Sequence, residues 1–128
     1  GLSDAVSFFF LLSPTAVSLE LASASCMVLL SFQETAPLII GEAMASGVPV
    51  VVSNAGGARY MVEEGVTGYV VDASNTQRAA ERIIELVRDK EKAAAMGLAG
   101  RVAALKRFHL DRIIEQTLNV YERVVGGR

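Results

Sequence analysis

The sequence is poor in cysteine. Cys26 is the only one among 128 residues, so no disulfide can form within the chain. Its neighbours Ser25, Met27 and Val28 suggest the entrance of a strand, where a buried, inert thiol is preferred over a reactive one. This use of cysteine favours a reducing, cytoplasmic setting.

An apolar run long enough for a membrane is also missing. The charge-free stretch 5–19 is interrupted by Pro14 and is shorter than the roughly 20 apolar residues that a spanning helix needs. Asp4 stands where a signal peptide would carry basic residues, and no small-residue cleavage pattern follows. We therefore expect neither an integral membrane segment nor a signal peptide.

Positive charge is absent from the first part of the chain. No Lys or Arg precedes Arg59, although the whole sequence has twelve such residues and a net charge of -2. This balance argues against nucleic acid or an acidic membrane surface as a partner. An anion bound by the residues before Arg59 would have to rely on backbone N–H groups and helix ends.

Short, continuous apolar runs are what the sequence has in abundance. Such runs, without polar alternation, are typical of parallel strands that are covered on both faces. They predict strands at 5–13, 26–31, 48–53 and 68–71, with helical patterns between them. The chain is thus expected to form one domain, 1–128, of the α/β class: an open, Rossmann-like parallel sheet of about four strands with C-terminal helices.

Capping residues predict where the helices begin and end. Ser13 and Pro14 begin a helix that runs to about Ala24, and Gly47 ends a helix that begins near Pro37 or Leu38. Three more helices are predicted at about 72–89, capped by Asp72 or Ser74, at 90–107, loosened by Gly97 and Gly100, and at 111–125.

Side-chain spacing predicts which faces of the last helices are buried. In the helix ending near Asp89, pairs Arg82–Glu85 and Glu85–Arg88 are expected on the outer face. The inward-facing residues are expected to be Ala79, Ile83, Leu86 and Val87, and in the last helix Ile113, Thr117, Val120, Tyr121 and Val124. These helices are interpreted as scaffold, and the lone His109 as a packing or capping residue.

Two carboxylates stand near an otherwise apolar helix. Because the helix around Glu42 is apolar nearly all round, an ionised Glu42 must meet a donor, shift its pKa or face a cleft. It could accept hydrogen bonds from a ligand diol, or simply be solvated at a rim or paired across the fold. Glu34 lies in the preceding loop, and Gly56-Gly57 could either cradle a phosphate or form a tight turn.

Taken together, these residues resemble a known family. The pattern Ser31-x-x-Glu34, seven residues, Glu42-Ala-Met-Ala-x-Gly-x-Pro-Val-Val, then Gly56-Gly57, is similar to the donor-site signature of retaining GT-B glycosyltransferases of group 1 (glycosyltransferase family four type). The continuation "VEEGVTGYVVDASN" and the ending "RFHLDRIIEQTLNVYERV" resemble the same family. The resemblance covers essentially the whole chain.

The resemblance implies a nucleotide sugar as donor and a role for each site residue. Glu42 would hold the ribose hydroxyls, and Glu34 would contact the donor sugar as the catalytic-site carboxylate. Backbone groups of Thr35, Ala36, Pro37 and Leu38 would approach the diphosphate, with Gly56 and Gly57 nearby. Retaining members use no metal-binding Asp-x-Asp motif and this chain has none, so no metal or other cofactor is expected.

The sequence departs from the family pattern in three respects. Thr35-Ala36-Pro37 replaces the usual Gly-Phe-Gly, and Pro37 removes one N–H donor. Tyr60 stands where a glutamate is common. The family's N-terminal acceptor domain and the start of the donor domain, with its basic residues, are not represented. The resemblance therefore implies a single, truncated C-terminal domain that does not turn over alone.

Further alternatives stay open. The chain could instead belong to a nucleotide-sugar epimerase of the GT-B fold, or be a non-catalytic α/β interaction module. Without the family's first strands, the 5–13 strand should have an exposed apolar edge, which favours rearranged pairing or a homo-oligomer. A clean monomer in sedimentation at high concentration would argue against self-association.

Overall fold

Three short parallel strands form the sheet, in the order β1-β2-β3. In the computed structural model, which describes residues 2–126, they span Met27–Leu29, Val50–Ser53 and Gly68–Val71. Met27 is paired with Val50, and Val50 with Gly68. The α/β class and the open parallel sheet are confirmed, with three strands in the described residues in place of the expected four.

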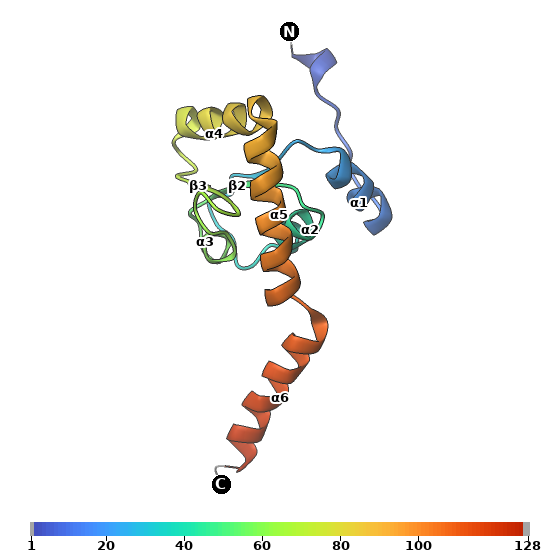
Figure 1. Ribbon diagram of the computed structural model, residues 1–128, viewed down its shortest axis with the longest axis vertical. Helices are drawn as coiled ribbons and strands as arrows, with labels where there is room; N and C mark the ends of the chain where they lie inside the picture. The colour runs from blue at the N-terminus through green and yellow to red at the C-terminus, as the bar shows by residue number, and fades with distance from the viewer. Residues whose placement is uncertain (1, 127–128) are drawn as a thin grey trace.

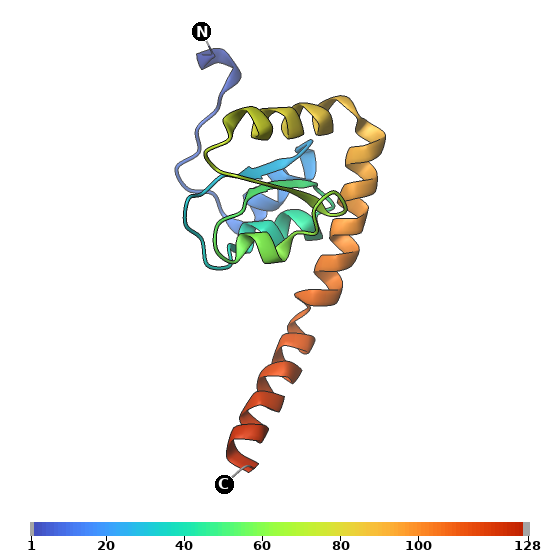
Figure 2. The same cartoon turned by 90° about the vertical axis from the view of Figure 1, so that its left-hand side faces the viewer.

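Helices cover both faces of this sheet. Helix α4 (Thr76–Arg88) lies on one face, and α2 (Leu38–Ala45) and the short α3 (Ala58–Met61) lie on the other (Figure 2). Helix α1 (Pro14–Ser23) precedes β1, and α5 (Lys90–Arg107) runs beside the sheet towards α6 (Leu110–Gly126) (Figure 1). A turn of 3-10 helix, η1 (Ser3–Ala5), precedes α1.

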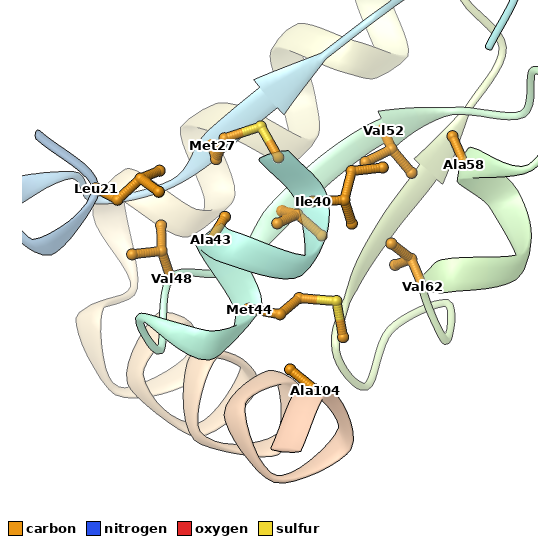
Figure 3. Close-up of a cluster of buried hydrophobic side chains, with 11 residues drawn as sticks. Leu21, Met27, Ile40, Ala43, Met44, Val48, Val52, Ala58, Val62 and Ala104 are labelled. Carbon is orange, nitrogen blue, oxygen red and sulfur yellow. The ribbon is translucent and has the colours of Figure 1, made fainter. Parts of the chain in front are cut away.

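The central strand β2 is buried on both faces, as the continuous apolar pattern predicts. Val50 and Val52 join a hydrophobic cluster with α2, and Val51 joins a second cluster under α4. In Figure 3 the labelled side chains of the first cluster gather around α2. Half-buried Cys26 packs on the second cluster, and burial raises the pKa of its thiol, which disfavours the reactive thiolate.

The expected strand at 5–13 is wrong. After η1 the chain is extended but unpaired within the described residues, and Phe8, Phe10 and Leu11 are 83%, 103% and 93% exposed. A strand needs a neighbour for its backbone hydrogen bonds, and no described segment pairs with this one. Self-association through this apolar segment stays a prediction.

Most of the predicted helix ends are confirmed. The Ser13 hydroxyl accepts the Ala16 N–H at 3.2 Å, and Gly47 has a left-handed φ of 77° after α2. The predicted caps of α4 are wrong, because Asn75 accepts the Arg78 N–H at 2.9 Å. Asp72 instead accepts bonds from the hydroxyl and N–H of Ser74, which lower the pKa of its carboxyl. Asp72 therefore stabilises the turn that precedes α4 and does not cap the helix.

The last helix does not fold back on the domain. Helix α6 points away from the sheet (Figure 1), and it has no buried residue. Ile113, Val120, Tyr121 and Val124, predicted to face inward, are 43% to 66% exposed. The amphipathic pattern defined a face correctly, but no described element packs on it. Val87, also predicted to be inward, is 50% exposed, whereas Ala79 and Leu86 are buried.

A polar cluster joins β3, α4 and α5 around Glu85. Its carboxylate accepts hydrogen bonds from Lys92, from Arg82 at 2.7 Å and from the Tyr69 hydroxyl at 2.9 Å. The Arg82 guanidinium lies 4.2 Å from the centroid of the Tyr69 ring. The predicted Arg82–Glu85 pair is confirmed, whereas Lys92 from α5 takes the place expected for Arg88. The cluster ties the two helices to the strand.

This cluster should make stability depend on acid pH. Hydrogen bonds from Lys92 and then Arg82 lower the pKa of Glu85 from 4.5 to about 2. The pKa of Glu85 is thus lower in the folded state than in the unfolded state. Its contribution to the stability of the fold is therefore fully present above about pH 4.5 and is lost as the pH falls towards 2. The variant Glu85→Gln should therefore unfold at lower urea than the parent at pH 7, and the difference should shrink between pH 4.5 and 3.

A matched control is Glu81→Gln on the same helix. Glu81 accepts hydrogen bonds from Arg78 at 3.3 Å and Gln77 at 3.2 Å on the surface of α4. The Arg78 and Glu81 side chains are about half exposed (49% and 50%), so loss of the Glu81 charge should change the urea midpoint little. A difference between parent and Glu85→Gln that stays constant from pH 7 to pH 3 would contradict the role assigned to Glu85.

Candidate functional site

The loops that follow β1 and β2 meet at the carboxyl edge of the sheet. Ser53, fully buried at the end of β2, donates its hydroxyl hydrogen bond to the Ser31 carbonyl at 2.6 Å. The Ser31 hydroxyl in turn donates to Glu34 Oε1 at 2.9 Å. Glu34 is half-buried, and Ser31 fixes one of its carboxylate oxygens. The other oxygen accepts no hydrogen bond from the residues that the structure describes.

The two glycines of the second loop lie against the backbone of the first. A Cβ added to Gly56 would stand 1.7 Å from the Glu34 carbonyl oxygen, and one added to Gly57 would stand 1.5 Å from that of Thr35. The Gly57 N–H donates to the Glu34 carbonyl at 3.2 Å. Only glycine permits this approach, and φ is also left-handed, 48°, at Gly56. The pair therefore holds the Glu34 loop, and the Gly57 N–H is already engaged.

Pro37 directly precedes helix α2, which begins at Leu38. Its φ of -69° is the value the ring prefers, and no side chain caps the helix. The first N–H groups of a helix have no partner inside it, so this end carries partial positive charge. Thr35 and Ala36 before it are exposed. The helix end can therefore interact with an anion even though this part of the chain has no Lys or Arg.

Glu42 is exposed, which corrects the expectation of a helix buried on most sides. Helix α2 buries Ile40, Ala43 and Met44, and Glu42 lies off that face. No ion pair or hydrogen bond joins its carboxylate to another residue between 2 and 126. Pairing across the fold is thereby excluded for the described chain, leaving solvation at a rim or binding of a ligand.

A groove of about 480 Å³ runs beside Glu42. Its walls are apolar apart from Glu42 and His109. They come from α2, α3, the end of α5 and the start of α6: Leu38, Gly41, Ala45, Met61, Ala104, Leu105, Phe108, Leu110 and Ile113. The sequence interpretation missed the contribution of α5 and α6, whose apolar positions look the same as those of a scaffold helix.

The structure thus groups the predicted residues in two neighbouring sets. One set is a contact between the two loops, formed by Glu34, Thr35, Gly56 and Gly57. The other set lines the groove and consists of Leu38 and Glu42, one turn apart on α2. No role was predicted for Ser53 itself, which holds the Ser31 carbonyl at the end of β2. His109 is 58% exposed beside Asp111, so it does not pack in the core. It directly precedes α6 and its carbonyl accepts the Ile113 N–H at 3.2 Å, which agrees with the capping alternative. Among residues 2–126, no three acidic, His or Cys side chains gather as a metal would require.

Comparisons with known proteins identify the family. The family described as "Glycosyl transferases group 1" matches residues 1–103. N-acetyl-alpha-D-glucosaminyl L-malate synthase of Bacillus anthracis is 33% identical over 105 residues, which is 82% of this chain and 28% of that protein. This chain therefore spans less than a third of that relative's length.

Solved structures agree with this relation. Sucrose-phosphate synthase from Thermosynechococcus elongatus superposes with a TM-score of 0.91 at 27% identity, over 99% of this chain and 32% of that one. Anabaena HepE in complex with UDP-glucose gives a TM-score of 0.87 at 28% identity, over 94% of this chain and 33% of that one. No helix between residues 2 and 126 is both long and apolar enough to cross a bilayer. By sequence and by fold, the chain belongs to the group 1 glycosyl transferases.

Proposed function

We propose that the chain is the donor-nucleotide-binding part of a retaining glycosyltransferase. Such an enzyme moves a sugar from a nucleoside-diphosphate sugar to an acceptor hydroxyl, and the acceptor would be bound by a separate N-terminal domain. The observation that carries the proposal is the Glu34 carboxylate, fixed by Ser31 and held against the glycine loop next to the first turn of α2. The Anabaena relative solved with UDP-glucose supports a nucleotide sugar as ligand.

Each residue of the site has a chemical role in this proposal. The free oxygen of Glu34 accepts a hydroxyl of the donor sugar, and Glu42 accepts both ribose hydroxyls. The first turn of α2 faces the diphosphate, whose charge rises as the bond to the anomeric carbon breaks. Pro37 contributes a fixed φ but no N–H, and its carbonyl already accepts the Ile40 N–H at 3.2 Å. The donors to the diphosphate here are therefore the N–H groups of Leu38 and Ile39. No metal takes part in these roles.

Titration with nucleotides tests the proposal. UDP, GDP and their sugars are titrated into the chain by calorimetry, and one of the two series should bind. The variant Glu42→Ala should then bind that nucleotide roughly 10- to 100-fold more weakly, because two hydrogen bonds to a charged group are lost. The parent should also prefer the nucleotide over its 2′,3′-dideoxy analogue, and Glu42→Ala should remove this preference.

The matched control is Glu20→Ala, a second exposed glutamate, on α1. It should leave nucleotide affinity unchanged. The proposal is overturned if no nucleotide binds to the chain or to a longer protein that carries it, or if a nucleotide binds and Glu42→Ala leaves its affinity unchanged. Formation of an epimer without any acceptor would point to the epimerase alternative.

A further inference from the structure

Arg107, the last residue of α5, reaches across to the short helix α3. Its Nη2 donates to the Tyr60 carbonyl at 2.7 Å and its Nη1 to the Met61 carbonyl at 3.3 Å. Tyr60 and Met61 are the last two residues of a four-residue helix, so no following helical turn supplies N–H donors to their carbonyls. A guanidinium supplies two donors of fixed geometry and a charge that suits the carboxyl end of a helix.

The opposite end of α3 contacts the loop that carries Glu34 and Thr35. Gly57 is the residue before α3, and it is both packed on the Thr35 carbonyl and bonded to the Glu34 carbonyl. Helix α3 therefore lies between the Arg107 guanidinium and the segment that carries Glu34. With only four residues, it can transmit a shift from one end to the other as a rigid unit.

Apolar packing alone does not fix the orientation of α3. Ala58 and Val62 are buried in the cluster around α2, together with Ala104 of α5 (Figure 3). These contacts hold α3 on the core, but hydrophobic contacts are non-directional. The two hydrogen bonds from Arg107 are directional, and they begin one turn after the buried Ala104. Arg107 therefore adds the constraint that the packing lacks.

We propose that Arg107 is a positioning residue of the donor site, which acts through α3 and Gly57 on the placement of Glu34. This inference rests on the proposed function, because it takes Glu34 as the residue that contacts the donor sugar. Arg107 itself contacts no substrate in this arrangement. It should therefore affect binding of the sugar portion more than binding of the nucleotide, which Glu42 holds from the middle of α2.

The variant Arg107→Met keeps the length of the side chain and removes the donors. The affinity of this variant for the sugar nucleotide should fall roughly tenfold. The sugar nucleotide is UDP-glucose or GDP-mannose, whichever the parent binds. The affinity for the matching diphosphate, UDP or GDP, should change less than about twofold, since a purely structural defect would weaken both ligands together. Arg107→Lys keeps the charge and one donor, so it should recover part of the loss.

The control variant is Arg101→Met, an exposed position on the same helix. It should leave both affinities unchanged. The positioning role would be overturned if both Arg107→Met and Arg107→Lys bound the sugar nucleotide and the diphosphate equally more weakly. It would also be overturned if neither variant changed either affinity.

A second measurement needs no ligand and separates the two proposals. In Arg107→Met the Gly57 amide should exchange with solvent roughly tenfold faster, because its bond to Glu34 opens more often. If the amide is unchanged, the inference about Arg107 is wrong whatever binds. If the amide is loosened but the parent binds no nucleotide, the coupling through α3 stands and the proposed function fails.

Discussion

Alanine at Gly57 should weaken sugar-nucleotide binding by roughly tenfold or more, which corresponds to about 1.4 kcal/mol. The new Cβ would stand 1.5 Å from the Thr35 carbonyl oxygen, so the two loops must separate. Separation also weakens the bond from the Gly57 N–H to Glu34. Overpacking of this kind costs about 1–3 kcal/mol of stability. Calorimetric titration and urea unfolding measure the two effects.

Gly65 provides the matched control for Gly57→Ala. It has a left-handed φ of 74°, and no atom lies within 4 Å of an added Cβ. Gly65→Ala should therefore lose about 1 kcal/mol of stability through backbone strain but keep its affinity for the ligand. Because φ at Gly57 is an ordinary -75°, a large effect there arises from the contact alone. Equal affinities for the parent and Gly57→Ala would show that the loop contact does not support binding.

Local signals in the sequence predict much of the scaffold. Ser13-Pro14 and Gly47 act on the backbone within one helical turn, so their effect does not depend on distant partners. Helix α5 begins and ends at the predicted residues, 90 and 107. The fully apolar run at 50–53 also predicts a strand covered on both faces, which the structure confirms. In each case the residues that decide the structure lie next to one another.

The sequence pattern does not show which segments distant in sequence will pack together. The run at 5–13 has the composition of a buried strand, but only a neighbouring strand could make it one. Helix α6 has a well-defined apolar face, and the sequence does not say which element covers it. For α6 the pattern defines an apolar face correctly, whereas for 5–13 it predicts a strand that does not form; in neither segment does it name a partner.

The same limit applies to the candidate site. Strand ends predict that Glu34 and Gly56 lie at one edge of the sheet, because the carboxyl ends of parallel strands meet there. That the glycines pack on the Glu34 backbone depends on a fit of tenths of an ångström, which spacing does not reveal. The reach of Arg107 to α3 spans 46 and 47 residues of sequence, and no local signal indicates it.

Alanine at Gly97 should destabilise the fold by about 3 kcal/mol. The sequence pattern of α5 suggests that its glycines loosen the helix, but Gly97 and Gly100 are both buried. An added Cβ at Gly97 would lie 2.0 Å from the Gly47 carbonyl oxygen and 3.4 Å from Pro49 Cδ. Helix α5 would have to move away from the end of α2. Urea unfolding followed by circular dichroism measures the loss.

Gly100→Ala is the matched control, three residues along the same helix. Its Cβ would lie 3.6 Å from the Thr67 carbonyl oxygen and 3.7 Å from Met44 Cγ, which are ordinary contacts. Alanine is favoured over glycine in a helix by about 0.5–1 kcal/mol, so Gly100→Ala should equal or exceed the parent in stability. If the two variants were equally stable, close packing at Gly97 would not hold α5 against α2. The opposite signs expected here separate helix propensity from packing, since both substitutions change propensity alike.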